Sequence, residues 1–408
     1  MADVDVLIVG TGPAGVAAAE TLRAEGFDGS VVLAGREPDP PYERPPASKG
    51  YLQGRMSREA CLLHPPSWYE EQGIDLRTRS SVMKLDPVER VATLASKDEL
   101  RFGKALLATG ANVRRLRVED AALEGVHYLR ALGNADAIRA DAEQAERVVL
   151  IGGSYIACEV AASLTELGKR CTLVALEAEP LETGFGPQAG RFFRGLLEAR
   201  GIELATGETL ARFEGPEGGR VERVVTESGR GFDADLVVMG TGAAPDVMLA
   251  RAAGLELGES GGVRCDAALR TSAEHVWAAG DICEYESSVH GRRLRVEHWE
   301  VAAAQGRHAA RAMLGAPDPY TEVPYFWTDL SDWATAEYVG PAARWDQEVV
   351  RGSFDDGAFT VFYLDGGQVV AALTVGRSGD LDLARRLMTS GEDVSDRTDA
   401  LADPDGES

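Results

Sequence analysis

The sequence has little cysteine, and the spacing of the few cysteines is informative. They are Cys61, Cys158, Cys171, Cys265 and Cys283, and no two of them form a CxxC pair. A redox-active dithiol of the usual spacing and a set of iron–sulfur ligands are therefore excluded. An odd number of scattered cysteines is typical of reduced, mostly buried thiols.

Positive charge is also scarce in this chain. It has 42 Lys and Arg against 66 Asp and Glu, which gives a net charge of −24. This balance argues against nucleic acid, or an anionic membrane surface, as a partner. The six histidines show no metal-ligand spacing, so we expect no metal site.

Long apolar stretches are missing as well. No apolar run reaches 18 residues, so we expect no segment that spans a membrane. Residues 1–5 lack the basic start of a signal peptide, and we expect a cytoplasmic protein, either a monomer or a homodimer. The 408 residues, 44% of them hydrophobic, are enough for two or three domains.

A glycine-rich motif lies near the N-terminus, in DVLIVGTGPAGVAAAETL. Gly10 permits a tight turn after an apolar strand, and Gly12 lets the backbone approach a pyrophosphate. Gly15 allows the following helix to pack closely on the strand. Pro13 suits the first helical position because it has no N–H to leave unpaired. The motif predicts a dinucleotide on the N-terminus of a helix.

An acidic residue is expected after the next strand, where it would bind a ribose hydroxyl. The strand at residues 30–33 leads to Glu37, which is the candidate for this role. The alternative is a glycine-rich turn that binds nothing. The strand, turn, helix, second strand and acid all follow in order, which favours a nucleotide site.

A second, less regular motif lies about 140 residues further on, in RVVLIGGSYIACEVAASL. Gly152 fills the turn position, and Ala157 is an accepted variant of the third glycine. Ser154 stands where the second glycine is expected, and its Cβ should crowd the approach of a phosphate. Two such motifs predict two nucleotides bound by one chain.

The acid of the second motif is displaced from its usual place. The strand at residues 171–174 ends at Ala175, where an acid is expected, and Glu177 follows two residues later. No Arg comes directly after this strand, so a 2′-phosphate has no evident partner and NADH is favoured over NADPH. The alternative is a domain of the same fold that binds nicotinamide poorly.

The two motifs belong to modules that end alike. LATG at residues 107–110 and VMGTG at residues 238–242 are interpreted as the ends of equivalent strands. The pattern predicts a helix over residues 301–314. Short strands rich in Val and aromatics, at residues 359–364 and 368–375, indicate a third, α+β module.

The whole chain resembles one family of flavoproteins. It is similar to the FAD-dependent ferredoxin reductases of the putidaredoxin-reductase and biphenyl-dioxygenase-reductase type. Rubredoxin reductases and apoptosis-inducing factor belong to the same wider group. Besides LATG and the two glycine motifs, the resemblance rests on PPYERPPASKGYL at residues 40–52, AAGD at 278–281, RVEHW at 295–299 and PYFW at 324–327.

The resemblance implies an α/β fold with two Rossmann-like dinucleotide-binding domains and a C-terminal α+β domain. The expected FAD-binding domain is discontinuous, and the expected NAD(P)H-binding domain is inserted in it. The expected boundaries are 1–110 with 236–316 for FAD, 111–235 for NAD(P)H and 317–390 for the C-terminal domain. The tail at 391–408 is acidic, and we expect it to be disordered.

The resemblance also implies roles for individual residues. Lys49 would lie near the flavin N5 edge and pair with Glu159, which compensates a buried ammonium beside the redox centre. Its charge would favour the anionic reduced flavin. Asp281 would bind the ribityl chain of FAD. The alternative for Lys49 is a solvated surface lysine.

The remaining candidate positions fall into two groups. For FAD they are Gly10, Gly12, Pro13, Ala14, Gly15, Glu37, Arg44, Ala108, Thr109, Gly110, Gly280, Glu297, His298, Trp299 and Trp327. For the nicotinamide dinucleotide they are Gly152, Gly153, Ser154, Tyr155, Ile156, Glu177 and Gly242. Trp299 and Trp327 have the alternative of being core aromatics.

One departure from the family pattern follows PYFW. The family often continues with an acid, Gln and Tyr, whereas this chain reads TDLSDW at residues 328–333. Because the partner is thought to approach there, this change puts ferredoxin as the acceptor in doubt.

The resemblance implies that NADH gives hydride to FAD, and that single electrons then go to a ferredoxin or rubredoxin on another chain. Hydride transfer needs no side-chain acid or base, since the cofactors supply the chemistry. Two other hypotheses stay open. One is a slow flavoprotein similar to apoptosis-inducing factor, which would sense NAD(H) or bind a partner. The other is a reductase of a small molecule such as a quinone or oxygen.

Overall fold

The computed structural model describes residues 2–316, 318–404 and 406, and these residues form two compact units. Unit 1 contains residues 2–43, 62–112 and 244–326, and unit 2 contains residues 44–61, 113–243 and 327–408, each within the described ranges. The α/β class with two dinucleotide-binding folds is confirmed. The domain boundaries expected at residues 110, 235, 316 and 390 stay a prediction.

Unit 1 is built on a seven-stranded sheet with the order β3-β2-β1-β6-β5-β4, in which β18 also pairs with β6. Strands β3, β2, β1, β6 and β18 are parallel, and β4 and β5 continue the sheet antiparallel. The strands are β1 (Ala2–Val9), β2 (Val31–Ala34), β3 (Ile74–Arg77), β4 (Val82–Asp86), β5 (Val91–Leu94), β6 (Glu99–Leu107) and β18 (Val276–Ala278).

The other elements of unit 1 lie around this sheet. Its helices are α1 (Pro13–Ala24), α2 (Pro66–Glu71), α6 (Met248–Ala252) and α7 (Trp299–Met313). A small sheet contains β17 (Val263–Arg264), β19 (Cys283–Ser287) and β20 (Arg292–Leu294). Two of the points where the chain passes between the units lie in β7 (Ala111–Val113) and β16 (Ala243–Pro245), which pair with each other.

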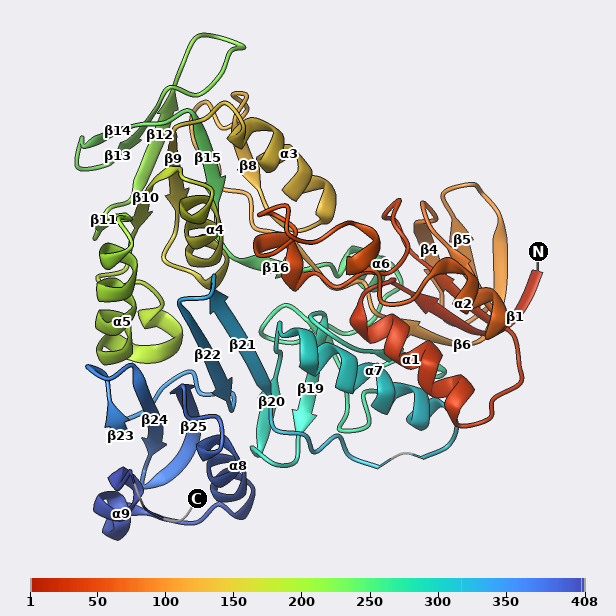
Figure 1. The fold of residues 1–408 in the computed structure, drawn as a ribbon. Coiled ribbons are helices and arrows are strands. Elements are labelled where there is room, and N and C mark those ends of the chain that lie inside the picture. Colours follow the sequence, from red (N-terminus) through yellow and green to blue (C-terminus); the bar gives the residue numbers. More distant parts are fainter. Residues whose placement is uncertain (1, 317, 405, 407–408) are drawn as a thin grey trace. The chain divides into compact units, whose positions relative to one another are not determined.

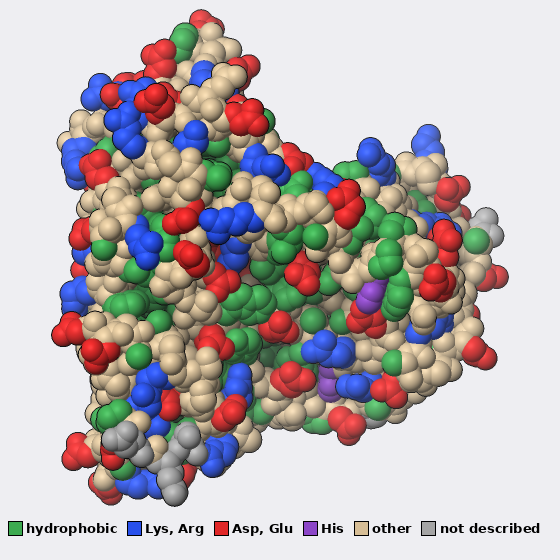
Figure 2. Space-filling view, viewed as in Figure 1, with side chains coloured by type: hydrophobic (Ala, Val, Ile, Leu, Met, Phe, Trp, Pro, Cys, Tyr) green, Lys and Arg blue, Asp and Glu red, His purple; other side chains and the backbone are tan. Residues whose placement is uncertain are grey.

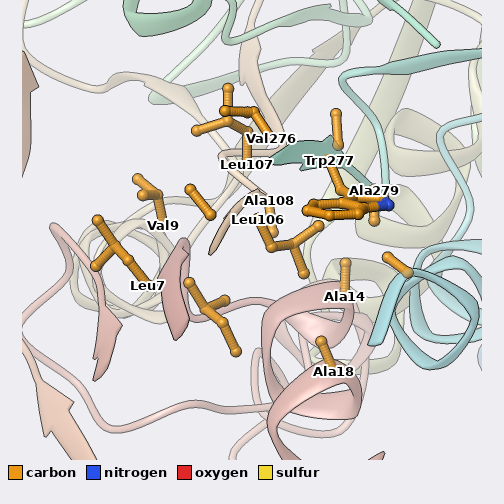
Figure 3. Packing of buried hydrophobic residues seen from close by; sticks show 14 of the residues in the cluster. Leu7, Val9, Ala14, Ala18, Leu106, Leu107, Ala108, Val276, Trp277 and Ala279 are labelled. Carbon is orange, nitrogen blue, oxygen red and sulfur yellow. The ribbon is translucent and has the colours of Figure 1, made fainter. Parts of the chain in front are cut away.

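The core of unit 1 explains why its central strands are continuous apolar runs. Strands of a parallel sheet with both faces covered are buried on both sides, and residues 6–9 of β1 are all buried. Helices α1 and α7 pack side by side (Figure 1). Small side chains of α1, including Ala14 and Ala18, belong to the same buried cluster as the sheet residues and Trp277. Figure 3 shows this layer with Leu7, Val9, Ala14, Ala18, Leu106, Leu107, Ala108, Val276, Trp277 and Ala279.

The first part of unit 2 is a five-stranded parallel sheet with the order β11-β10-β9-β15-β8. Its strands are β8 (Val126–Tyr128), β9 (Arg147–Ile151), β10 (Arg170–Ala175), β11 (Glu203–Thr206) and β15 (Leu236–Met239). Its helices are α3 (Leu132–Ala142), α4 (Tyr155–Glu166) and α5 (Glu182–Ala199). An antiparallel ribbon of β12 (Leu210–Glu214), β13 (Arg223–Thr226) and β14 (Gly231–Asp233) adjoins them, and the 3₁₀ turns η1 (Pro45–Ser48) and η2 (Glu59–Cys61) also belong to this unit.

The second part of unit 2 is a five-stranded sheet with the order β21-β22-β25-β24-β23. Its strands are β21 (Tyr325–Leu330), β22 (Ala334–Val339), β23 (Gln347–Ser353), β24 (Ala358–Asp365) and β25 (Gln368–Val375), and helix α8 (Asp380–Ser390) packs on β25. The strands predicted at residues 359–364 and 368–375 are therefore present.

The prediction of a disordered tail is wrong for residues 394–402. They form η3 (Ser395–Arg397) and α9 (Thr398–Ala402), and α9 packs against β23. Val394 and Leu401 are buried, and the carbonyl of Leu401 accepts a hydrogen bond of 2.8 Å from Arg351 Nε. The acidic composition of the tail gave no indication that Val394 and Leu401 would be buried and hold it against the rest of the unit. Residues 405, 407 and 408 lie outside the described part of the chain.

The surface carries charges of both signs. On the face in Figure 2, basic and acidic side chains are interspersed rather than gathered into one field. All five cysteines are free and buried, as the sequence predicts. Within the described ranges no helix has both the length and the apolar content needed to cross a bilayer.

Candidate dinucleotide sites and the Lys49–Glu159 pair

The first glycine motif forms a tight turn between β1 and α1 in unit 1. Gly10 has φ +123°, and a Cβ on it would lie 2.0 Å from the carbonyl oxygen of Ala108. A Cβ on Gly15 would lie 2.0 Å from the carbonyl of Gly10. At Gly12, by contrast, a Cβ would meet no atom of the described structure within 4 Å. Two glycines are thus required by packing, while Gly12 leaves open space in front of the α1 N-terminus, as a pyrophosphate needs.

The second motif repeats this geometry between β9 and α4 in unit 2. Gly152 has φ +108°, and a Cβ on it would lie 2.4 Å from the carbonyl oxygen of Gly240. Gly240 follows β15 as Ala108 follows β6, so LATG and VMGTG mark equivalent strands. Ser154 caps α4, and its Oγ donates a 2.9 Å hydrogen bond to that Gly240 carbonyl. The Ser154 hydroxyl is therefore held against the end of β15.

Glu177 lies at the position predicted for the ribose-binding acid. Its Oε2 is 3.1 Å from where a Cβ on Gly153 would stand, so the carboxylate faces the glycine-rich turn. Ala175 is the buried last residue of β10. The nearby Arg194 is engaged by the carboxylate of Glu179, at 2.5 Å. This end of the turn therefore presents the carboxylate of Glu177, which suits a ribose hydroxyl better than a 2′-phosphate.

Several residues predicted to bind FAD, among them Glu37 for the adenosine ribose, lie around the first turn. Glu37 follows β2 and accepts a 2.5 Å hydrogen bond from the Tyr42 hydroxyl. Thr109 donates to the carbonyl of Asp246 at 2.7 Å, and Gly110 has φ +69°. Pro13 and Ala14 begin α1.

A second group of unit 1 residues meets beside Gly280. The Gly280 N–H donates to Gln305 Oε1 at 2.8 Å, and Arg295 Nη1 donates to the Asp281 carbonyl at 3.1 Å. Among the buried side-chain nitrogens that have no hydrogen-bond partner within the described residues, three belong to this group: Gln305 Nε2, Arg295 Nε and His298 Nδ1. Buried polar atoms are normally paired, so unpaired ones call for an external group. Together with the open space at Gly12, they fit a polar cofactor such as FAD.

The imidazole of His298, one of the residues beside Gly280, is neutral. Burial lowers its pKa to about 4, although the charge of Asp281 acts in the opposite direction. Its ring lies 4.2 Å from that of Phe326, measured between centroids. At neutral pH the imidazole therefore carries one N–H donor and one acceptor. Glu297 is exposed and pairs with Arg295, while Trp299 is half-buried at the start of α7.

In unit 2 the predicted pair of Lys49 and Glu159 is present. Lys49 Nζ lies 2.7 Å from Glu159 Oε1, and Glu159 on α4 is only 4% exposed. Two hydroxyls also donate hydrogen bonds to the Glu159 carboxylate. Ser48 Oγ donates to Oε2 at 2.5 Å, and Thr328 Oγ1 donates to Oε1 at 2.7 Å. Lys49 is therefore not a solvated surface lysine.

The other unit 2 candidates are spread over several elements. Tyr155 and Ile156 begin α4, and Gly242 has φ +80° after β15. Arg44 donates to the Arg130 carbonyl at 2.9 Å. Trp327 is half-buried on β21. No group of three or more His, Cys, Asp or Glu in the described ranges is placed to bind a metal ion.

Sequence reasoning missed the two hydroxyls on Glu159. It placed Thr328 in a stretch where a partner protein approaches, but Thr328 is 1% exposed and bonded to Glu159. The alternation of burial along β21 puts Thr328 and Trp327 on opposite faces. The alternation of side chains along a strand was the sequence signal that could have placed Thr328 on the face opposite Trp327. Ser48 is adjacent to Lys49 in PPASK and could have been suspected on that ground.

Comparison with known proteins agrees with this geometry. Residues 4–306 match the model of the pyridine nucleotide-disulphide oxidoreductase family, and residues 325–407 match a reductase C-terminal domain. The 5,5′-dehydrodivanillate O-demethylase ferredoxin reductase subunit of Sphingobium sp. is 38% identical over 98% of this chain and 96% of its own.

Two further proteins are similar over nearly their whole lengths. The ferredoxin–NAD(+) reductase component of the anthranilate 1,2-dioxygenase system of Burkholderia cepacia is 35% identical, over 98% of this chain and 97% of its own. The crystal structure of a covalent putidaredoxin reductase–putidaredoxin complex matches with a TM-score of 0.90 and 33% identity, covering 96% of this chain and 94% of that chain. With its two glycine turns, its buried Lys–Glu pair and its C-terminal module, the chain belongs to the pyridine nucleotide-disulphide oxidoreductase family, among the ferredoxin reductases.

Proposed function

We propose that this protein is an NADH-dependent flavoprotein reductase that passes electrons to a ferredoxin-type iron–sulfur protein. The observation that carries the proposal is the duplicated turn, in which Gly10 meets Ala108 and Gly152 meets Gly240 in the same way. One turn serves FAD and the other NADH. Bound FAD supplies the redox chemistry, since it takes up a hydride as two electrons and releases them one at a time.

The residues of the chain bind, orient and exclude water. The α1 N-terminus would hold the FAD pyrophosphate, and Glu37 would bind a ribose hydroxyl. Gln305, Arg295 and His298 offer their unpaired buried nitrogens to the cofactor. In unit 2 the α4 N-terminus would hold the pyrophosphate of NADH, and Glu177 would bind one of its ribose hydroxyls. Lys49 would supply a positive charge that stabilises the reduced flavin.

The acceptor must supply its own iron–sulfur ligands, because the five cysteines of this chain are dispersed and buried. A ferredoxin fits the names of the relatives, and a rubredoxin is the near alternative. A cytoplasmic location is part of the proposal, since five free thiols suit a reducing compartment. Cell fractionation with an antibody would test the location.

The function is tested by anaerobic stopped-flow reduction of the yellow protein with NADH and with NADPH, followed by mixing with a purified [2Fe–2S] ferredoxin. We expect fast, saturable bleaching with NADH and rapid reoxidation by the ferredoxin. Slow bleaching with both nucleotides would contradict the reductase proposal. Fast bleaching followed by reoxidation only with a quinone or oxygen would replace the protein acceptor by a small molecule. A long-lived reduced complex with NAD would instead indicate a sensor.

The donor preference leads to a prediction for Glu177. Replacing Glu177 with Gln removes a charge-assisted hydrogen bond to ribose, and such bonds contribute about 1.5–3 kcal/mol. We expect the KM for NADH to rise about tenfold. The preference over NADPH should narrow, because the charge that repels a 2′-phosphate is lost. Steady-state kinetics with both donors measure the change, and Glu203→Gln, on the exposed start of β11, is the matched control.

A further inference from the structure

The carboxylate of Glu159 is shared among three donors that come from two separate segments of unit 2. Ser48 and Lys49 come from the turn that contains η1, Glu159 lies on α4, and Thr328 comes from β21. The Ser48 position is itself fixed, because Ser163 Oγ on α4 donates to the Ser48 carbonyl at 2.7 Å. The cluster is therefore a buried, fully connected polar network, of the kind that fixes a single arrangement.

The three donors are divided unequally between the two oxygens. Lys49 Nζ and Thr328 Oγ1 both lie 2.7 Å from Oε1, whereas Ser48 Oγ lies 2.5 Å from Oε2. A hydroxyl that donates to a carboxylate oxygen offsets part of its negative charge. Thr328 therefore competes with Lys49 for the same oxygen. As a result the ammonium of Lys49 is compensated less than it would be by a bare carboxylate.

We propose that Thr328 and Ser48 are positioning residues that set how much of the Lys49 charge reaches the flavin, by donating hydrogen bonds to Glu159. The inference rests on the proposed function, because it takes Lys49 to lie beside the flavin. Thr328 makes this setting depend on the C-terminal module, since β21 is the first strand of that module. The module thus contributes to the electrostatics around Lys49 through this hydrogen bond.

The test is Thr328→Val, which keeps the shape of the side chain and removes the hydroxyl. Glu159 then compensates Lys49 more fully, so reduced flavin is stabilised less. We expect the two-electron equilibrium for flavin reduction to fall about tenfold, which corresponds to a midpoint potential about 30 mV more negative. Reduction by NADH should slow by about the same factor. The potential is measured by anaerobic chemical titration against a reference dye, so it does not depend on NADH.

Two comparisons separate positioning from simple loss of packing. Thr328→Ser keeps a hydroxyl and should stay within about twofold of the parent protein. Thr335→Val is the matched control, because Thr335 Oγ1 donates at 2.7 Å to Asp329 on an exposed part of the same module. Its flavin potential should be unchanged. Ser48→Ala removes the donor to Oε2 and should shift the potential in the same direction as Thr328→Val.

The proposal is overturned if Thr328→Val binds FAD and keeps the parent potential, or if Thr328→Ser shifts the potential as far as valine does. If Thr328→Val yields no soluble flavoprotein, Ser48→Ala is judged by the same criterion. The two proposals fail in different ways. A parent protein that NADH does not reduce would remove the proposed function, while the chemical titration would still report on the hydroxyls.

Discussion

Replacing Lys49 with methionine is expected to slow flavin reduction by NADH about 100-fold. Methionine keeps an unbranched side chain of similar length and removes the ammonium that pairs with Glu159 at 2.7 Å. Loss of one electrostatic stabiliser at the reacting group typically costs about 10²–10³ in rate. Glu159, 4% exposed, would then carry its charge with only the Ser48 and Thr328 hydroxyls as partners. The field beside the flavin would change from nearly neutral to negative, which opposes hydride uptake.

The measurement is single-turnover bleaching at saturating NADH, with FAD content checked by the ratio of visible to ultraviolet absorbance. Lys84→Met is the control, since Lys84 is an exposed residue on β4 in unit 1. An unchanged bleaching rate in Lys49→Met at full FAD content would refute the role of Lys49 at the flavin. A lower FAD content with a normal rate would assign Lys49 to cofactor retention.

The second large effect is expected in the C-terminal module, at Asp380. Its Oδ1 accepts from Arg351 at 3.0 Å, and its Oδ2 accepts from Arg377 at 2.8 Å and from Thr360 at 2.7 Å. The Arg351 side chain is 2% exposed and that of Asp380 is 6% exposed. Asp380→Asn leaves the buried guanidinium without its counter-charge, and breaking a buried pair costs about 3–5 kcal/mol. We expect the free energy of unfolding of this module to fall by about that amount.

Urea unfolding followed by circular dichroism measures the loss, and the same helix provides a control. Asp382 pairs with Arg385 at 2.8 Å, but its side chain is 82% exposed. Asp382→Asn should therefore change the stability by less than about 1 kcal/mol. Equal effects of the two substitutions would mean that burial of the Arg351–Asp380 pair has no energetic consequence.

The same network gives a pH dependence with a defined sign. Burial raises the pKa of Asp380, but hydrogen bonds from Arg377, Thr360 and Arg351 outweigh it and hold the pKa below its ordinary value. A carboxyl with a lowered pKa in the folded state stabilises the fold above its unfolded pKa of about 3.9, and this contribution is lost as the pH falls through the folded pKa. The stability difference between the parent protein and Asp380→Asn should therefore be full at neutral pH and shrink below about pH 4.

Local patterns were sufficient to predict the two dinucleotide turns. The roles of Gly10 and Gly152 follow from their spacing, because only a residue without Cβ fits a turn pressed against a neighbouring carbonyl. Glu177 was found in the same way, two residues beyond the expected place. The glycine spacing can be recognised within a single βαβ unit, although the carbonyls that Gly10 and Gly152 meet, those of Ala108 and Gly240, come from strands far along the chain.

Contacts between distant segments were not accessible in this way. Thr328 donates to a residue 169 positions away, and nothing in the spacing of PYFWT indicates that partner. The prediction of a disordered tail was wrong for a related reason. The acidic composition of the tail indicated disorder, but Leu401 is buried through contacts with β23 and with Arg351, about 50 residues earlier. The partners of such residues are set by tertiary packing, which composition does not record.

The strict alternation along β21 limits how this module can change in length during evolution. Thr328 faces the buried Glu159, while Trp327 lies on the other face of the strand. Deleting or inserting one residue upstream within the strand would exchange the two faces, because side chains alternate with a period of two. A residue added or removed beyond Leu330, in the turn at residues 331–333, would leave the two faces of β21 unchanged. The hydrogen bond between Thr328 and Glu159 therefore fixes the register of β21 but sets no such limit on the length of the turn after it.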